Sequence, residues 1–318
     1  FSQPDRLSPK SLRKMLPKRP EFEAARKGLL EIPDNDELFA QTIDGAYVVT
    51  GFAMTGGKTT EAAPAIKAGF AENGDRAAPY LPAYSGAMKV LSNIEEKAAG
   101  NGALNAIPES DGVYRRIPMF VTLSDKIYPS LVAESLRVAQ DASTFIIQAV
   151  GASGEEGFGE TGLVSFKVGA VKVPTDENGQ IWVRFTGDIP ERYVPAWKLL
   201  DGSAPAEKLE GHIVLIGTSA AAMKDLRATP LDPAAAGVSL HAEALETILT
   251  GNFLNRPDFA HGLEVVASFL LGLLLIWLLP KWGSVWCAVL TLVAISGVVG
   301  GAWYAFDVHN WLLDPIYF

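Results

Sequence analysis

The stretch Leu263–Leu279, LEVVASFLLGLLLIWLL, determines how this chain is organised. It contains one charged residue, Glu264, at its edge. A helix rises about 1.5 Å per residue, so a helix over this stretch nearly matches a membrane hydrocarbon core of roughly 30 Å. The next four residues, Pro280–Gly283, supply a helix stop, a cation and an interfacial aromatic side chain. The pattern predicts a transmembrane helix over 262–280.

A second apolar run, Ser284–Phe306, follows at once and carries no charge. Two buried helices of a large soluble core are the alternative, but length and lack of charge together favour a second transmembrane helix over 284–306. Its small residues Gly297, Gly300 and Gly301 would let another helix approach closely. We therefore expect contact with lipid and with other membrane helices or a second copy of the chain. The mostly apolar segment 311–318 predicts the start of a further transmembrane helix.

The orientation of these segments follows from their flanking charges. The short connection between the two runs carries Lys281 and no acid, whereas Asp307–Asn310 carries an acid and no Lys or Arg. Basic residues stay on the cytoplasmic side of membranes. We therefore expect Lys281 in the cytoplasm and residues 1–260 outside, in the periplasm of a bacterium whose inner membrane holds the helices.

Composition excludes several classes of protein for the N-terminal part. The chain has 318 residues, a formal net charge of −9 and a sequence pI near 5.1, which argues against nucleic-acid binding. Its one cysteine, Cys287, lies in the second apolar run. Residues 1–260 therefore hold no disulfide, thiolate metal site or cysteine nucleophile. Freedom from cysteine also suits an oxidising compartment such as the periplasm.

Residues 1–260 alternate between predicted strands and helices, which indicates an α/β or α+β domain with a mixed sheet. Strands are expected at Tyr47–Phe52, Val113–Leu123, Leu163–Val173, Ile181–Phe185 and His212–Ile216. Helices are expected at Ser8–Leu16, Asp36–Gln41, Pro129–Ala139, Ala196–Leu200 and Gly237–Leu249, and a loop is expected over Met54–Ala83. The turn sequence Asp176–Gly179 ends in Asn-Gly and predicts a β-hairpin between its flanking strands.

An ordered series of short motifs resembles one family of sensor domains. The series is Ala103–Asn105, Asp111–Pro118, Tyr128–Leu131, Leu136–Ala139, Gly211–Ser219, Asp225–Pro230, Gly237–Val238, His241–Ala242 and Phe253–Pro257. In this order and spacing the set resembles the second type of CHASE domain, an extracytoplasmic sensor named for cyclases and histidine kinases. The resemblance covers nearly all of residues 1–260, and the apolar segments after them also fit.

The resemblance implies a role in signalling. Such a sensor follows an N-terminal membrane helix, and typically three membrane helices and a cytoplasmic output domain come after it. The output is an adenylate or guanylate cyclase, a histidine kinase or a Ser/Thr kinase. We expect this chain to be a fragment of such a receptor, with a cyclase as the output that is commonest in the family. The alternative is a non-enzymatic envelope protein whose domain docks a partner and whose helices anchor it.

Catalytic patterns in the chain lack the context that their chemistry needs. Gly157–Gly162 matches the dinucleotide fingerprint, but it leads into a predicted strand, whereas the fingerprint must open a helix. His241, Glu243 and Glu246 could share part of a helix, yet Glu243 would point away from the other two, so no metal site is expected. A hydrolase is disfavoured because no motif pairs a base with a nucleophile. We expect no catalytic residue, metal or cofactor here.

One constellation remains as a candidate ligand site. The run His212–Ile216 is typical of a strand covered on both faces, and it leads directly into Gly217, Thr218 and Ser219. Ligands of open α/β sheets usually sit beyond the carboxyl ends of strands, where free N–H groups and hydroxyls can hold a polar or anionic group. Asp225 and Arg227 follow within reach. The alternative, which the sequence favours, is that these residues only shape a turn and pair with each other.

Overall fold

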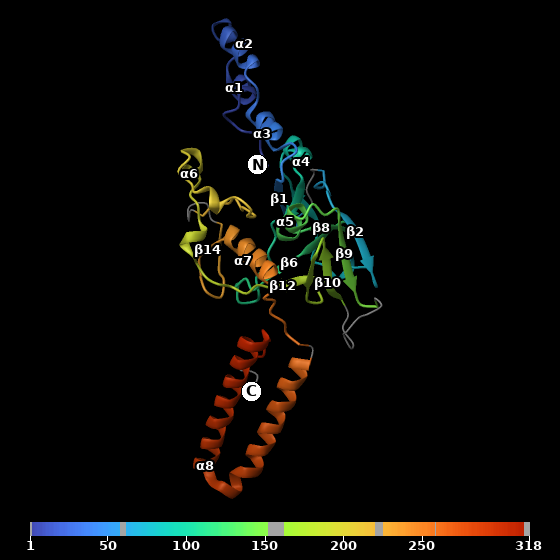
Figure 1. Cartoon of the computed structure of the whole chain (residues 1–318), viewed down its shortest axis with the longest axis vertical. Coiled ribbons are helices and arrows are strands. Elements are labelled where there is room, and N and C mark those ends of the chain that lie inside the picture. Colours follow the sequence, from blue (N-terminus) through green and yellow to red (C-terminus); the bar gives the residue numbers. More distant parts are fainter. Residues whose placement is uncertain (1, 58–61, 152–161, 220–224, 258, 315–318) are drawn as a thin grey trace. The chain divides into compact units, whose positions relative to one another are not determined.

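The computed structural model describes residues 2–57, 62–151, 162–219, 225–257 and 259–314. Helices and short strands are mixed throughout the N-terminal part, which confirms the expected mixed α/β class (Figure 1). The chain divides into two compact units. The first comprises Phe1–Ile181 and Phe185–Glu246, and the second comprises Trp182–Arg184 and Thr247–Phe318.

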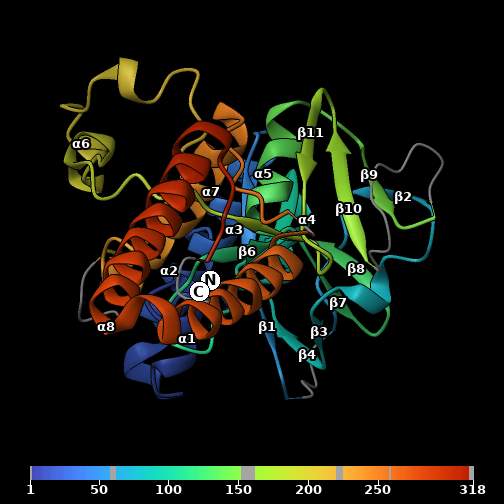
Figure 2. The same ribbon diagram turned by 90° about the horizontal axis from the view of Figure 1, so that it is seen from below.

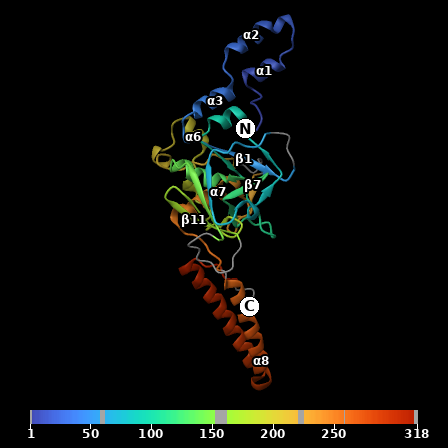
Figure 3. The same ribbon diagram turned by 90° about the vertical axis from the view of Figure 1, so that its right-hand side faces the viewer.

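The first unit begins with helices α1 (Pro9–Met15), α2 (Glu23–Glu31) and α3 (Asn35–Ile43). The Ser8 hydroxyl accepts the N–H of Ser11, so the predicted cap and helix are confirmed. Helix α2 was not expected. Its Arg26 donates to the carbonyls of Arg13 and Leu16, which would otherwise lack a partner at the end of α1. The two helices extend away from the strands (Figure 3).

A three-stranded sheet lies at the start of the strand region. Strand β1 (Val49–Thr55) runs between β4 (Gly86–Met88), which is antiparallel, and β5 (Gly100–Ala103), which is parallel. Helix α4 (Ser92–Lys97) precedes β5, and helix α5 (Leu131–Ala139) packs on β5 and β1. The close approach of α5 requires glycine in β5, because a Cβ on Gly102 would lie 2.6 Å from the Leu131 Cα.

Four further strands run side by side in the order β11 (Val171–Pro174), β10 (Leu163–Val168), β9 (Thr144–Ala149) and β2 (Gly69–Asn73) (Figure 2). Strand β9 pairs parallel with β2 and antiparallel with β10. A third small sheet contains β3 (Ala83–Tyr84), β7 (Phe120–Leu123) and β8 (Lys126–Pro129). Buried Phe120 contacts Phe145 of β9 and Phe166 of β10 edge to face, with ring centroids 5.2 and 5.0 Å apart. These rings form the core between the two sheets.

Two predictions about this region are wrong. The segment Met54–Ala83 is not all loop, since it contains β2. The predicted hairpin around Asn178-Gly179 is a real turn, but its flanking strands do not pair with each other. Strand β10 instead turns back at Gly169, where φ is +53°, and pairs with β11, while β12 (Gln180–Trp182) pairs with β6 (Arg116–Pro118). The two-residue connection Gly169–Ala170 joins β10 directly to β11, so β11 pairs with β10 in place of β12.

The predicted strand Val113–Leu123 is divided into β6 and β7. The division falls at Met119, whose N–H donates to the Gly179 carbonyl at 2.9 Å and whose carbonyl accepts from Ser130 N at 2.8 Å. Gly179 directly precedes β12, the partner of β6, and Ser130 directly follows β8, the partner of β7, so Met119 joins the two pairings and one apolar run serves two sheets. The predicted strand Tyr47–Phe52 is confirmed as β1, which begins two residues later and ends three residues later than predicted and has alternating burial.

The predicted buried strand His212–Ile216 is wrong. None of these residues is in a strand, and the side chains of Val214 and Ile216 are 48% and 92% exposed. An apolar run becomes a strand only where a neighbour supplies hydrogen bonds. No described strand pairs with it. The run lies instead after helix α6 (Ala196–Leu200), which was predicted with the same bounds.

The second unit is dominated by α8 (Phe259–His309), in which two helices meet at Gly283. The part Gly283–His309, 27 residues, is long and apolar enough to cross a membrane, which agrees with the predicted helix 284–306. The predicted helix 262–280 is present as an apolar helix over Gly262–Leu278, which is shorter than that standard. Residues 311–314 are not helical and 315–318 lie outside the described residues, so a third membrane helix stays a prediction.

Candidate functional site

Helix α7 (Gly237–Thr250) organises the region that holds the candidate residues. It was predicted over Gly237–Leu249, with Gly251 after its end, and Gly251 has the expected positive φ of +70°. Its first residue, Gly237, donates its N–H to the Asp225 carbonyl at 2.8 Å. One face of its first two turns lines a cavity, while His241 is buried elsewhere on the helix.

The first turn of α7 gathers three of the five predicted ligand-site residues. A Cβ on Gly217 would lie 2.5 Å from the Cβ of Val238, so this glycine permits close contact with the helix. The Asp225 carboxylate lies against Gly237, where a Cβ would be 2.6 Å from either oxygen. Arg227 forms an ion pair with Asp225 at 3.1 Å.

The remaining two residues, Thr218 and Ser219, are exposed in the segment that precedes 220–224. Ser219 lines the cavity, whereas Thr218 does not. The strand that should have placed all five at a sheet edge is absent, so their grouping depends on α7 instead. Their role in ligand binding stays a prediction. The pairing of Arg227 with Asp225 agrees with the alternative interpretation of a structural turn.

His241 is buried beside this turn, and its Nδ1 has no hydrogen-bond partner among the residues that the structure describes. Burial lowers the pKa of the imidazole to about 4. The nearby Asp225 carboxylate and a hydrogen bond to the Leu104 backbone both oppose that shift. The described residues contain no group of three His, Cys, Asp or Glu side chains that could hold a metal ion. His241 is therefore a buried neutral imidazole at neutral pH.

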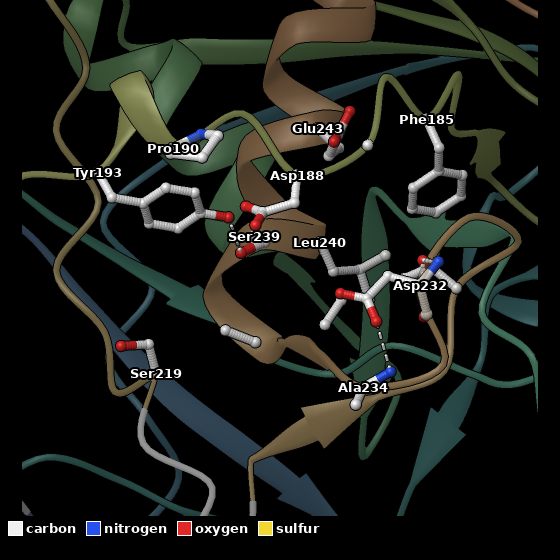
Figure 4. A pocket seen from close by; sticks show the side chains of 14 residues that line it. Phe185, Asp188, Pro190, Tyr193, Ser219, Asp232, Ala234, Ser239, Leu240 and Glu243 are labelled. Atoms are coloured by element: carbon white, nitrogen blue, oxygen red, sulfur yellow. Dashed lines mark hydrogen bonds between the residues drawn. The ribbon is translucent and has the colours of Figure 1, made fainter.

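A cavity of about 350 Å³ lies on the neighbouring face of α7 (Figure 4). Its walls come from α7, from the segment after β12 and from the turn around Asp232. The lining residues are Phe185, Gly187, Asp188, Pro190, Tyr193, Ser219, Thr229, Asp232, Ala234, Ala235, Ala236, Ser239, Leu240 and Glu243. Among them are three carboxylates, and the described lining contains no Lys, Arg or His.

Hydrogen bonds hold most of the polar lining in place. Buried Glu243 accepts the N–H and the hydroxyl of Thr186, each at 3.0 Å. Asp232 accepts the Ala234 N–H at 2.8 Å through one carboxylate oxygen. The Tyr193 hydroxyl and the Ser239 hydroxyl lie 3.0 Å apart and share a hydrogen bond. The site can therefore present fixed acceptors and an aromatic ring to a small ligand.

Sequence analysis missed every lining residue except Ser219, and it considered Glu243 only as a metal ligand. The acids come from three separate segments, so no local spacing brings them together. The weak local signal is that Asp188 and Asp232 stand close before Pro190 and Pro233. Acids beside proline are typical of turns, which carry binding residues more often than strands do.

A separate buried network in the first unit is structural. The Glu134 carboxylate accepts both the Nε and the Nη2 of Arg137, at 2.9 and 2.7 Å, and also the Asn101 N–H. The Asn101 side chain donates to Glu95, whose other oxygen pairs with Lys89 at 3.1 Å. Every charge in this network has an opposite charge or donors beside it, which is what a buried charge requires.

The sequence Gly157–Gly162, whose match to the dinucleotide fingerprint was rejected above, lies outside the described residues except for Gly162. That glycine leads into β10, a strand, as expected. A Cβ on Gly162 would lie 2.4 Å from the Glu177 carbonyl oxygen, so close packing accounts for this glycine. Nothing in the described part of the motif opens a helix.

Comparison with known proteins gives one match. A family model described as the CHASE2 domain matches residues 1–296 of the chain. No curated protein matches it, and no solved structure matches it either.

Proposed function

The chain belongs to the CHASE2 domain family, and from this premise we propose that it is the sensory and membrane region of a bacterial nucleotide cyclase. Membership gives the coarser role, which is extracytoplasmic sensing in a signalling receptor, and confirms the resemblance seen in the sequence. The finer proposal adds three elements. The output is an adenylate or guanylate cyclase, the helices lie in the inner membrane, and the domain faces the periplasm.

The form of α8 supports the membrane part of the proposal. Its two limbs run side by side with the bend at Gly283 at their far end (Figures 1 and 3). At the other end Asn255 forms a β-bridge with Trp311. There the Glu264 carboxylate also accepts hydrogen bonds from Arg256 at 2.8 Å and from the Asp314 N–H at 2.9 Å. The chain thus enters and leaves the hairpin on one side, which leaves Lys281 on the other.

The surface of the hairpin also supports insertion. Large apolar side chains of both limbs are exposed, among them Ile276, Val285, Trp286 and Trp303, which are 72%, 73%, 63% and 71% exposed. Soluble proteins rarely leave such a continuous apolar surface in water. Lipid or other helices would cover it. In the second unit the Nζ of Lys281 lies 3.4 Å from the centroid of the Trp277 ring, a pairing suited to an interface.

Signal transmission would be a shift between two packings of the membrane helices, biased by events in the domain. Helix α7 carries the cavity residues Ser239, Leu240 and Glu243 and continues to Thr250, only a short segment before α8. A change at the cavity therefore has a short covalent route to the hairpin.

Cysteine labelling tests the orientation that carries this proposal. In a background with Cys287→Ser, a single cysteine is placed at Ser203 or at Lys281 in the full-length receptor. An impermeant maleimide applied to intact spheroplasts should label the first and should label the second only after lysis. The reverse pattern would end the sensor proposal.

The output is tested separately in membranes of cells that express the full-length receptor. Formation of cyclic AMP from ATP, or of cyclic GMP from GTP, supports the cyclase. Transfer of labelled phosphate to protein without cyclic nucleotide would instead point to a kinase. Membranes without either activity, from a receptor with the expected orientation, would favour the envelope-anchor alternative.

A further inference from the structure

The cavity beside α7 has the size and form of a small-molecule site. Its volume of about 350 Å³ is at the lower end of the range that small-ligand sites occupy, roughly 300–1,000 Å³. Apolar and polar groups are mixed in its wall. Phe185, Pro190 and Leu240 supply apolar surface, and Ser219, Ser239 and Thr229 supply hydroxyls (Figure 4). A few polar groups in an apolar wall are typical of sites that orient one ligand.

The charge of the wall selects the ligand. Asp188, Asp232 and Glu243 line the cavity and no described lining residue is basic. The two arginines nearest along these segments form ion pairs with acids outside the lining, and Arg192 also donates to the Thr186 hydroxyl at 3.0 Å, the hydroxyl that donates to Glu243. Arg192 pairs with Glu246 at 2.6 Å, and Arg227 pairs with Asp225 at 3.1 Å. A cavity with acids and without a cation attracts positive ligands and repels anions.

The three acids differ in how firmly they are held. Glu243 is buried and fixed by Thr186, and Asp232 is oriented by the Ala234 N–H. Asp188 is exposed, and among the described residues its carboxylate has no hydrogen-bond or ion-pair partner. A ligand would therefore meet two fixed carboxylates in the wall and one carboxylate at the rim. Fixed acceptors bind at lower entropic cost than flexible ones.

An aromatic ring completes the arrangement. The hydroxyl of Tyr193 is tied to Ser239 of α7 at 3.0 Å, so the ring is held beside the cavity (Figure 4). Aromatic faces attract organic cations. A metal ion would instead need several oxygen ligands around one point, and the described residues offer no such cluster.

We propose that this cavity binds a small organic cation that carries a protonated amine. The ammonium group lies among the carboxylates of Asp188, Asp232 and Glu243, and the alkyl part lies against Phe185, Pro190 and Leu240. This inference deepens the proposed sensory function, since it names the chemical class of the signal.

The test uses the full chain in detergent and isothermal titration calorimetry with four amines: putrescine, spermidine, choline and ethanolamine. At least one should bind. The variants Asp188→Asn and Asp232→Asn should each weaken that binding about tenfold, the effect of losing roughly 1.4 kcal/mol. The matched control is Asp201→Asn, an exposed acid outside the cavity, which should leave binding unchanged. Higher salt should also weaken binding.

Three results would overturn the amine proposal. These are no binding of any of the four amines, equal weakening by Asp201→Asn, and tighter binding of citrate or Ca²⁺ than of the amines. If Asp232→Asn fails to fold, Asp188→Asn alone decides, because that residue is exposed at the rim. Binding is measured on purified protein, so its failure leaves the labelling and cyclic-nucleotide results intact. The converse also holds, because a wrong orientation would not abolish amine binding.

Discussion

Asn105 shows how a motif residue acts at the scale of one side chain. Its amide oxygen accepts the Met54 N–H at 2.7 Å and its amide nitrogen donates to the Met54 carbonyl at 3.0 Å. The side chain therefore pairs with β1 as a backbone strand would. Arg116, from the same motif series, forms a bidentate pair with Glu109 and a bond to Asp176 at 2.9 Å. Both motif residues have a structural role that their spacing did not reveal.

His241 leads to a prediction about pH. Its pKa is lowered from 6.5 to about 4 in the folded chain, so between these values the unfolded chain binds a proton that the folded chain does not. The free energy of unfolding should therefore fall as pH drops through this window, by about 1.4 kcal/mol per pH unit and about 3 kcal/mol in all. Denaturant unfolding of the full chain in detergent at several pH values measures this free energy of unfolding.

The matched variants for this measurement are His241→Gln and His212→Gln. The first removes the buried imidazole and should flatten the dependence between pH 4 and 6.5. The second removes an exposed imidazole and should leave the dependence as it is. An unchanged slope in His241→Gln would show that other groups are responsible. Asp111, whose pKa its partner Arg115 lowers to about 2, acts only below this window.

At the scale of the element, Gly283 determines the form of α8. Its φ of +77° and ψ of +170° lie in a region that only glycine occupies readily. Gly283→Ala should therefore strain the bend by about 1–3 kcal/mol. Gly272→Ala, inside the first limb with open space around it, should be neutral or slightly stabilising. Thermal unfolding in detergent, followed by circular dichroism, compares the two, and equal melting temperatures would contradict the assigned role of the bend.

The small residues of the second limb lead to a prediction about assembly. Apart from the backbone of the same helix, no atom of the described residues lies within 4 Å of a Cβ built on Gly297, Gly300 or Gly301, so this face is open. We propose that another membrane helix or a second copy packs there. Gly300→Leu should reduce the oligomeric state measured by light scattering in detergent, whereas Val285→Leu on the same limb should not. If Gly300→Leu changes neither oligomeric state nor signalling, this face is not an interface.

At the scale of the whole molecule, the residues around α7 must be tested through the output of the receptor. The ion pair of Arg227 with Asp225 is partly exposed, with side chains 40% and 42% accessible, so Arg227→Ala should cost at most about 1 kcal/mol. Ser219 is exposed, and Ser219→Ala should cost less. If these residues bind a ligand, both variants shift the output of the receptor while the melting temperature stays nearly constant. Losses of output and of folded protein in equal proportion would contradict a ligand role.

Local sequence was enough for several helices of this chain and for its long apolar helix. Ser8 and Ser130 cap helices because a cap acts within three residues. The apolar helix Gly283–His309 can be predicted from the sequence because length and lack of charge are local properties. Tertiary structure alone decided the strand partners and the cavity. His212–Ile216 has the composition of a strand, but none of the described strands pairs with it. Asp188, Asp232 and Glu243 line one cavity only because α7 folds between distant segments. Pairing and proximity depend on residues far apart in the chain, and no local pattern records them.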